Sequence, residues 1–160
     1  KITLLVTQAA EGKILYRDRP FSFKLPAFEV EERGDRYFLS SKNFEHYDPV
    51  INTLTNMPVD KLVAYYRTWY PLIGQAFGEL GLPGSFDEQV DSVIERILAV
   101  EVLSPPIELE KPKSVTYKFL DSKLESASQL EKWLWRAGPD NTKRIQGLAR
   151  RLREALETSN

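Results

Sequence analysis

Apolar residues recur at helical spacing over most of the chain after Ser40, whereas the first forty residues carry shorter and more varied patterns. The run ITLLVT at 2–7 is apolar and β-branched, which predicts a short strand. In 28–40, apolar and polar residues alternate on both sides of Gly34, which predicts a β-hairpin with a tight turn. Between these segments, prolines break any helix, and we predict irregular structure.

Local signals predict where the later helices begin and end. A serine with a glutamate three residues later forms a capping box, and this pattern predicts helices that begin after Ser85 and after Ser128. The second of these helices is expected to stop at Gly138–Pro139. Further starts are predicted at Asp48–Pro49 and Pro58, a short cap at Asp121, and a final helix that is capped by Asp140 or Asn141 and runs to about Leu156.

These elements predict an α+β fold that is mostly α. We expect a bundle of about five helices with a small N-terminal β-hairpin. The length of 160 residues is typical of one domain, in which 1–40 would form a β and irregular arm and 41–160 the bundle. A connection marked by prolines at 104–112 and an alternating, extended segment at 114–119 interrupt the helical part.

The stretch YYRTWYPLIGQAFGELGLPG at 65–84 is unusually aromatic. At a helical period, its apolar positions fall within about half of the helix circumference, which predicts a central helix that faces the core. Pro71 lacks an N–H group and should kink this helix. The core-facing positions are Leu62, Val63, Tyr66, Trp69, Tyr70, Ile73, Ala76, Phe77 and Leu80.

Composition excludes several classes of protein. The chain has no cysteine, so disulfides, zinc–thiolate sites and cysteine nucleophiles are absent. Its net charge is −1, which argues against a dedicated nucleic-acid-binding protein. The longest uncharged stretch is too short to span a bilayer, so we expect no membrane span in this sequence. It begins with Lys1 and its only methionine is Met57, which indicates a fragment or a processed chain.

No motif predicts catalysis. His46 is the only histidine, and neither a metal-ligand cluster nor a nucleophile elbow accompanies it. The glycines at 74, 78 and 81 have the spacing of a helix face, not of a phosphate-binding loop. Acidic residues such as Asp87, Glu88 and Asp91 are those that a helix N-terminus favours. We therefore predict no catalytic residue, metal or cofactor.

The final helix carries five cations and no acid within 142–153. Such a face could bind phosphate, an acidic partner or an anionic lipid surface, or it could simply be solvated. Arg150 and Arg151 are its candidate binding residues. In the preceding helix, Trp135 lies off the apolar stripe, and two interpretations stay open: packing against a second element, for which the final helix is the default, or presentation to a partner.

Several segments in this order resemble one family, the bacterial domain of unknown function 3014. They are NFEHYDPVINTL, VAYYRTWYPLIGQAFGELGLPGSFDE, VIERIL, YKFLDSKLES and EKWLWRAGPDNTKRIQGLARRLR, which together with the spaces between them cover about three quarters of the chain. His46 stands where the family has arginine, and Phe77 where it has tyrosine. The residues that fit the pattern are Asn43, Tyr47, Asp48, Tyr70, Pro71, Leu72, Ala76, Glu79, Leu80, Gly81, Phe86, Tyr117, Phe119, Asp121, Leu124, Glu125, Lys132, Arg136, Gly138, Pro139 and Asn141.

The resemblance implies a membrane-anchored protein of the bacterial cell envelope, with this domain on the periplasmic side of the membrane; the cytoplasm is the alternative. It brings no known activity. We expect a non-catalytic interaction or structural module, whose partner could be another envelope protein. The alternatives are an enzyme with a site near Tyr47, Asp48 and Tyr70, and an anion-binding module that uses the basic last helix. Glu79, at the polar edge beside the Pro71 kink, completes the candidate residues.

Overall fold

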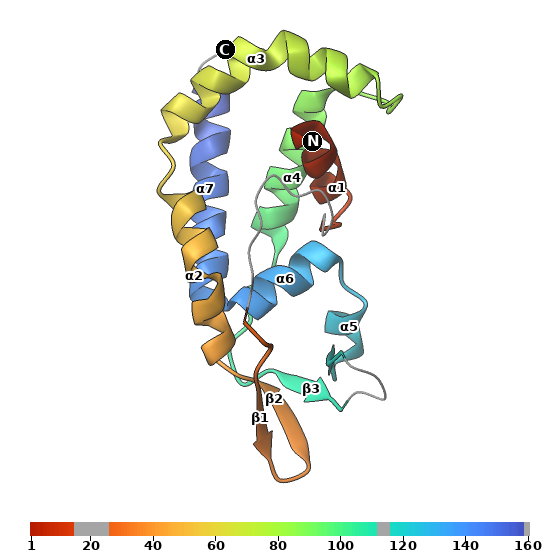
Figure 1. Cartoon of the computed structure of the whole chain (residues 1–160), viewed down its shortest axis with the longest axis vertical. Coiled ribbons are helices and arrows are strands. Elements are labelled where there is room, and N and C mark those ends of the chain that lie inside the picture. Colours follow the sequence, from red (N-terminus) through yellow and green to blue (C-terminus); the bar gives the residue numbers. More distant parts are fainter. Residues whose placement is uncertain (15–25, 112–115, 159–160) are drawn as a thin grey trace.

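The computed structural model describes residues 1–14, 26–111 and 116–158. Within these ranges the chain forms seven helices and four strands, so the predicted α+β, mostly helical class is confirmed, with two more helices than expected (Figure 1). The helices are α1 (Ile2–Ala10), α2 (Lys42–Thr55), α3 (Val59–Gly78), α4 (Phe86–Ala99), α5 (Ser122–Glu125), α6 (Gln129–Ala137) and α7 (Pro139–Thr158), and the strands are β1 (Val30–Arg33), β2 (Arg36–Leu39), β3 (Glu108–Glu110) and β4 (Lys118–Phe119).

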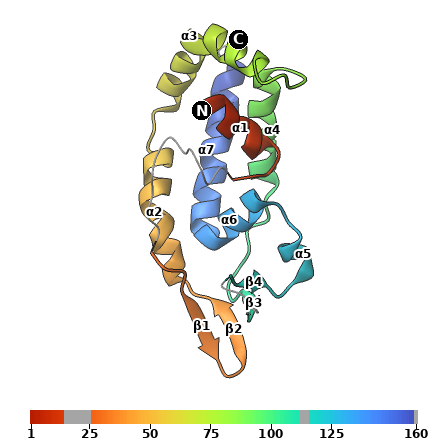
Figure 2. The ribbon, with the colours of Figure 1, turned by 45° about the vertical axis from the view of Figure 1, so that its right-hand side comes forward.

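The long helices stand along the long axis of the molecule and the sheet lies at one end. Helix α7 contacts α2 on one side and α4 on the other, and α1 lies against α4 (Figures 1 and 2). Helix α6 crosses between the helical part and the sheet, while α3 spans the opposite, upper end (Figure 2). None of the described helices is both long and apolar enough to cross a membrane.

The sheet is antiparallel, with the strand order β1-β2-β3-β4. Its first two strands are the predicted hairpin, in which Val30 pairs with Leu39 and Gly34 takes a positive φ of 63° in the turn. The other two strands come from 108–119, so the β element is not confined to the N-terminal part. A two-pronged contact from Arg36 to Glu108 joins β2 to β3, with an Nη2–Oε2 distance of 2.5 Å.

Two apolar clusters hold the described part together. The larger one joins the sheet to α2, α6 and α7, with Ile51 and Leu134 fully buried at its centre. The smaller one fixes the first turns of α3 to α7 through Val59, Val63 and Leu148. Burial of these side chains is the main stabilising term of the fold.

The predicted strand at 2–7 was wrong, because these residues form the helix α1. Thr3 and Thr7, four residues apart, are its buried side chains. The helix ends at a turn in which Gly12 has a φ of 75°, and Arg96 of α4 donates to the carbonyl of Ala10. Packing against α4 has therefore overridden a β propensity, which is a weak and context-dependent preference. Much of the adjoining segment predicted to be irregular lies outside the described residues.

The predicted helix start at Asp48–Pro49 was also wrong. Helix α2 begins at Lys42 and contains Pro49. Its buried residues Asn43, Tyr47, Val50 and Ile51 form one continuous face, and Pro49 lies on the exposed side. Burial of that face stabilises a helix across a residue that would otherwise end it.

The expected caps are largely confirmed. Both capping boxes are formed, at Ser85 with Glu88 and at Ser128 with Glu131. Asp121 caps the short α5. The final helix begins at Pro139, before either of its expected caps, because proline fits the first helical position. Trp135 is buried, as one of the two interpretations expected, but the partners of its ring are Phe119, which it meets edge on, and the Glu101 carbonyl, to which its Nε1 donates a hydrogen bond.

Helix α3 is not the central core helix that its aromatic content predicted. It is a single helix with Pro71 inside it, and it curves over the upper end of the molecule (Figure 1). Only Val59, Val63 and Phe77 are buried in it. Trp69 is 55% exposed and Leu72, from the same aromatic stretch, is 56% exposed. The apolar residues of α3 therefore lie on two faces, of which only one is buried against the described part of the chain.

Candidate functional site

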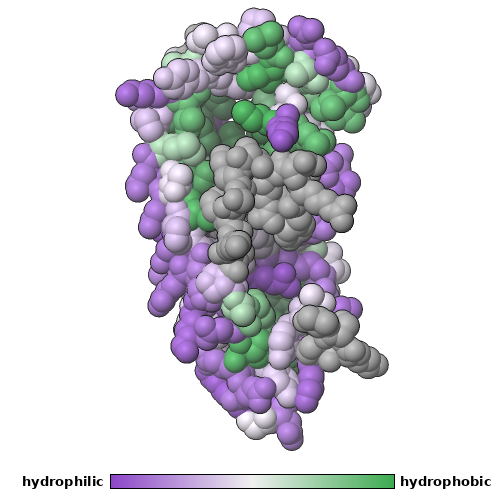
Figure 3. Space-filling model, viewed as in Figure 1, coloured by the Kyte–Doolittle hydropathy of each residue, from purple (hydrophilic) through white to green (hydrophobic). Residues whose placement is uncertain are grey.

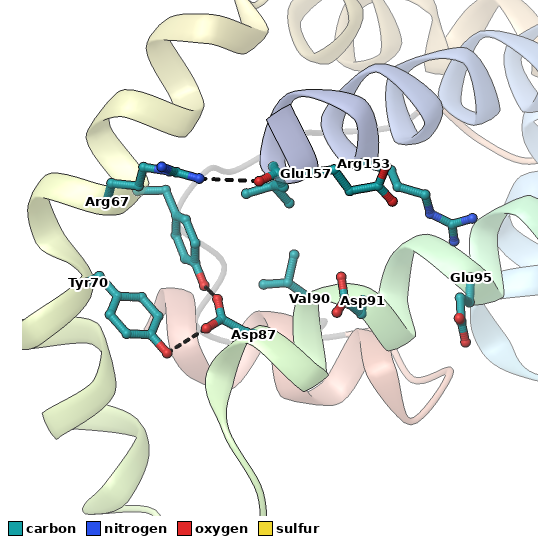
Figure 4. A pocket seen from close by; sticks show the side chains of 10 residues that line it. Arg67, Tyr70, Asp87, Val90, Asp91, Glu95, Arg153 and Glu157 are labelled. Atoms are coloured by element: carbon teal, nitrogen blue, oxygen red, sulfur yellow. Dashed lines mark hydrogen bonds between the residues drawn. The ribbon is translucent and has the colours of Figure 1, made fainter. Parts of the chain in front are cut away.

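A cavity of about 820 Å³ lies between α3, α4 and α7. Figure 3 shows a recess in the surface beneath the upper end, and Figure 4 shows the side chains from close by. We call it the three-helix cavity. Its lining residues are Tyr66, Arg67, Tyr70, Asp87, Val90, Asp91, Glu95, Arg153, Leu156 and Glu157.

Two tyrosines of α3 converge on one carboxylate of α4 at the mouth of the cavity. Tyr66 donates its hydroxyl hydrogen to Oδ1 of Asp87, and Tyr70 donates to Oδ2 at 2.6 Å (Figure 4). The two rings meet edge to face, with centroids 5.6 Å apart. Four residues separate the tyrosines, so they lie on the same face of the helix. The carboxylate thus holds both rings in fixed positions.

Local sequence explains where Asp87 stands. The capping box of Ser85 and Glu88 starts α4 at Phe86, and this places Asp87 in its first turn. Phe86 is buried, and its ring contacts both Tyr66 and Phe77 of α3. This aromatic contact brings the start of α4 against the inner face of α3, within reach of the two hydroxyls.

The tyrosines of the cavity stay protonated at ordinary pH. Burial, followed by the hydrogen bond to Asp87, strongly raises the pKa of Tyr66. The hydrogen bond to Asp87 is the main cause that raises the pKa of Tyr70. Both phenols therefore act as hydrogen-bond donors, and neither is suited to accept a proton as a general base.

Charged groups line the remaining walls. The cavity has four carboxylates, from Asp87, Asp91, Glu95 and Glu157, and two guanidinium groups, so its lining carries a net charge of −2 (4 negative, 2 positive). Arg67 donates to the carbonyl of Leu156 at 3.2 Å. The cavity therefore combines aromatic faces, hydroxyls and an excess of negative charge, which is chemistry for binding.

The structure separates the other residues that the sequence singled out. Tyr70 lines the three-helix cavity, whereas Tyr47 and Asp48 do not. Tyr47 is buried and its ring meets that of Trp133 edge on, at 5.5 Å. Asp48 accepts a hydrogen bond from Asn141 at 2.9 Å across α2 and α7. Tyr47, Asp48 and Tyr70 do not converge on one open pocket.

The remaining candidates lie apart from one another as well. Glu79 follows α3 and is exposed, with Gln75 as its hydrogen-bond donor. Arg151 donates to the carbonyl of Thr55 at 3.0 Å and so binds the C-terminal end of α2. Arg150 is exposed, and Arg153 lies on the cavity side of α7. Arg150, Arg151 and Arg153 of α7 therefore have different surroundings: solvent, the end of α2 and the three-helix cavity.

Sequence reasoning missed Asp87, Asp91 and Arg153 as site residues. The two acids were interpreted as first-turn residues that favour the helix N-terminus, and Asp87 does occupy that position. The spacing of Tyr66 and Tyr70 did indicate a shared face, but nothing local linked them to Asp87, which comes 17 residues after Tyr70. His46 is half-buried, and no group of metal-binding side chains occurs among the described residues.

The comparison with protein families matches residues 1–153 to a family described as "Protein of unknown function (DUF3014)". The chain belongs to this family. No significant match is found among curated proteins or among solved structures. Membership in DUF3014 confirms the resemblance seen in the sequence and brings no activity with it.

Several residues of the DUF3014 pattern stabilise the fold. The side chain of Asn43 is almost fully buried and bonds to the backbone of Glu29 and Ser40. Asn141 joins α7 to the Phe44 carbonyl and to Asp48. Much of the pattern therefore specifies architecture, while Tyr70 is the pattern residue that lines the cavity.

Proposed function

We propose that the chain is a non-catalytic interaction module of a membrane-anchored protein of the bacterial cell envelope, and that it pairs with a second copy of itself through the outer face of α3. The family resemblance supports the location, and the exposed apolar surface of α3 supports the interaction. The outer face consists of Lys61, Tyr65, Thr68, Trp69, Leu72, Gln75 and Glu79.

The exposure of large apolar side chains on this face is the observation that carries the proposal. Tyr65 is 64% exposed, and Trp69 and Leu72 are each more than half exposed. Each aromatic residue therefore offers roughly 100 Å² to solvent, since a buried aromatic covers about 150–250 Å². A cluster of this kind on a single helix indicates an interaction surface.

The charges at the two ends of the outer face favour pairing with a second copy in antiparallel orientation. A twofold axis near residue 70 would place Lys61 opposite Glu79 of the second copy, and Glu79 opposite its Lys61. The same axis sets Tyr65 opposite Gln75 and Leu72 opposite Thr68. A parallel pair would instead bring like charges together. The outer face is therefore self-complementary in one orientation.

The expected dimer is weak. One helix from each copy buries less than the roughly 1,200 Å² of a stable interface. We expect association that depends on concentration.

Analytical ultracentrifugation over a range of concentrations tests the proposal. Leu72→Glu should abolish the dimer, whereas Leu120→Glu, which changes an equally exposed leucine at the sheet end, should not. Lys61→Glu and Glu79→Lys should each weaken it, and the double variant should restore it. A wild-type chain that stays monomeric at millimolar concentration, or equal effects of the two leucine variants, would overturn the pairing.

A further inference from the structure

We propose that the three-helix cavity binds a linear organic cation with at least two protonated amines, a diamine or polyamine, between the paired tyrosines at its mouth and the acidic residues behind them. This inference concerns the inner face of α3 and is independent of the pairing through its outer face.

The mouth of the cavity offers a site for one amine. Each tyrosine hydroxyl donates its hydrogen to Asp87, so its oxygen still has lone pairs that can accept a hydrogen bond from an ammonium group. The faces of the two rings attract a cation as well. Because both rings are held by the same carboxylate and by each other, this site is formed before a ligand arrives.

Next to the tyrosines, Asp91 of α4 and Glu157 of α7 provide a site for a second amine. Asp91 stands one helical turn after Asp87, about 6 Å along the axis of α4. Glu157 lines the same cavity from α7. Neither Asp91 nor Glu157 has an ion pair or hydrogen bond with its side chain in the described part of the chain. A cation placed between two carboxylates is attracted by both and offsets their mutual repulsion.

The basic residues of the cavity do not neutralise this pair. Arg67 is directed to the carbonyl of Leu156, at the α3 end of the cavity. The guanidinium group of Arg153 lies on the far side, over Glu95 (Figure 4). With those two cations at the ends, Asp91 and Glu157 make the part of the cavity next to the tyrosines negative.

The ligand's length follows from these positions. An extended chain of four or five methylene groups spans a distance similar to one helical turn, which separates Asp87 from Asp91. Its apolar part would lie against Val90 and Leu156, the aliphatic side chains of the cavity. A volume of about 820 Å³ also leaves room for a longer polyamine.

Isothermal titration calorimetry with cadaverine and spermidine tests the assignment. Pentylamine has the same carbon chain as cadaverine but one amine, and glutarate has the same length with two negative charges. We expect cadaverine to bind at least tenfold more tightly than pentylamine, since a charge-assisted hydrogen bond contributes about a factor of ten. We expect glutarate not to bind, and the affinity for cadaverine to fall as salt rises.

Variants locate the site. Asp91→Asn and Glu157→Gln should each weaken cadaverine binding by about tenfold. Glu154→Gln changes an exposed acid of the same helix that does not line the cavity, and it should leave binding unchanged. Thermal unfolding of each variant confirms that it is folded. Equal binding of pentylamine, binding of glutarate, no binding at millimolar diamine, or equal effects of Glu154→Gln and Glu157→Gln would each overturn the proposal.

Discussion

The junction between α6 and α7 offers a sharp test of how this fold is determined. Gly138 joins the two helices with a φ of 94° and a ψ of 165°. This backbone conformation is essentially confined to glycine. A Cβ atom added there would lie 2.5 to 2.8 Å from three atoms of the Phe44 ring. Gly138→Ala therefore meets both a conformational and a steric obstacle.

The two obstacles have separate magnitudes. A side chain in that backbone region costs about 1–3 kcal/mol. Displacement of the Phe44 ring, which packs against the larger apolar cluster, costs about 1–3 kcal/mol more. The sum of about 2–6 kcal/mol is a large part of the 5–15 kcal/mol that stabilises a typical protein. For a chain of this length, it corresponds to a fall in Tm of about 5–20 °C.

Gly147→Ala is the matched control. Gly147 lies within α7, its φ is ordinary, and a Cβ atom there would meet nothing within 4 Å. Alanine should therefore stabilise the helix by up to about 1 kcal/mol. Chemical denaturation and thermal unfolding, followed by circular dichroism, measure both variants. If Gly138→Ala unfolds like the wild type, or if both variants shift in the same direction, the reasoning fails.

Three further predictions concern the core and the titratable groups. Leu134 is fully buried, so Leu134→Ala should lower the free energy of unfolding by about 2–5 kcal/mol in denaturant titrations. Burial opposes ionisation of Glu125, but hydrogen bonds from Lys132 and from the Phe119 amide outweigh it and lower its pKa. The stability that Glu125→Gln removes should therefore be present above about pH 4.5 and disappear as the pH falls below it, in unfolding curves at several pH values. The raised pKa values of Tyr66 and Tyr70 favour the folded state up to about pH 10, and this stability is lost as the pH rises further. Tyr66→Phe and Tyr70→Phe should therefore each make the loss of stability at alkaline pH less steep. An unchanged slope would contradict the hydrogen bonds to Asp87.

Features that depend on neighbouring residues alone could be predicted from the sequence. The capping boxes at Ser85 and Ser128 were located correctly because each involves residues three positions apart. The hairpin turn at Gly34 was predicted for the same reason. In each case, hydrogen bonds within a few residues determine the conformation, so the information is present in a short window.

Features that depend on tertiary contacts could not be predicted in this way. The strand expected at 2–7 is a helix that packs against α4 and has Thr3 and Thr7 as its buried side chains. Pro49 does not begin α2, because a buried face that starts at Asn43 runs along the other side of the helix and continues beyond Pro49. The strands β3 and β4 extend the hairpin from positions about 70 residues further along the chain. The pattern of apolar and polar residues within one segment does not reveal which other segment packs against it.

The candidate site was predicted only in part, for a related reason. Tyr70 was named from its place at the polar edge beside Pro71, and it does line the three-helix cavity. Asp87 was interpreted as a residue of the helix N-terminus, which it also is. The contact of Phe86 with Tyr66 and Phe77 brings Asp87 to the tyrosines, and a single sequence does not reveal such a contact.

Helix α3 shows why aromatic content alone is a poor guide to the core. Its inner face places Tyr66 and Tyr70 on the cavity, and its outer face exposes Tyr65 and Trp69 to solvent. A helix at the end of a bundle has a neighbour on one side only, so an apolar range of half a circle exceeds what that neighbour can cover. Exposure of the uncovered apolar side chains to water costs free energy, and association with another apolar surface would remove this cost. The same surplus of aromatic residues therefore connects the two proposals, since one face of α3 lines the cavity and the other is the proposed interface.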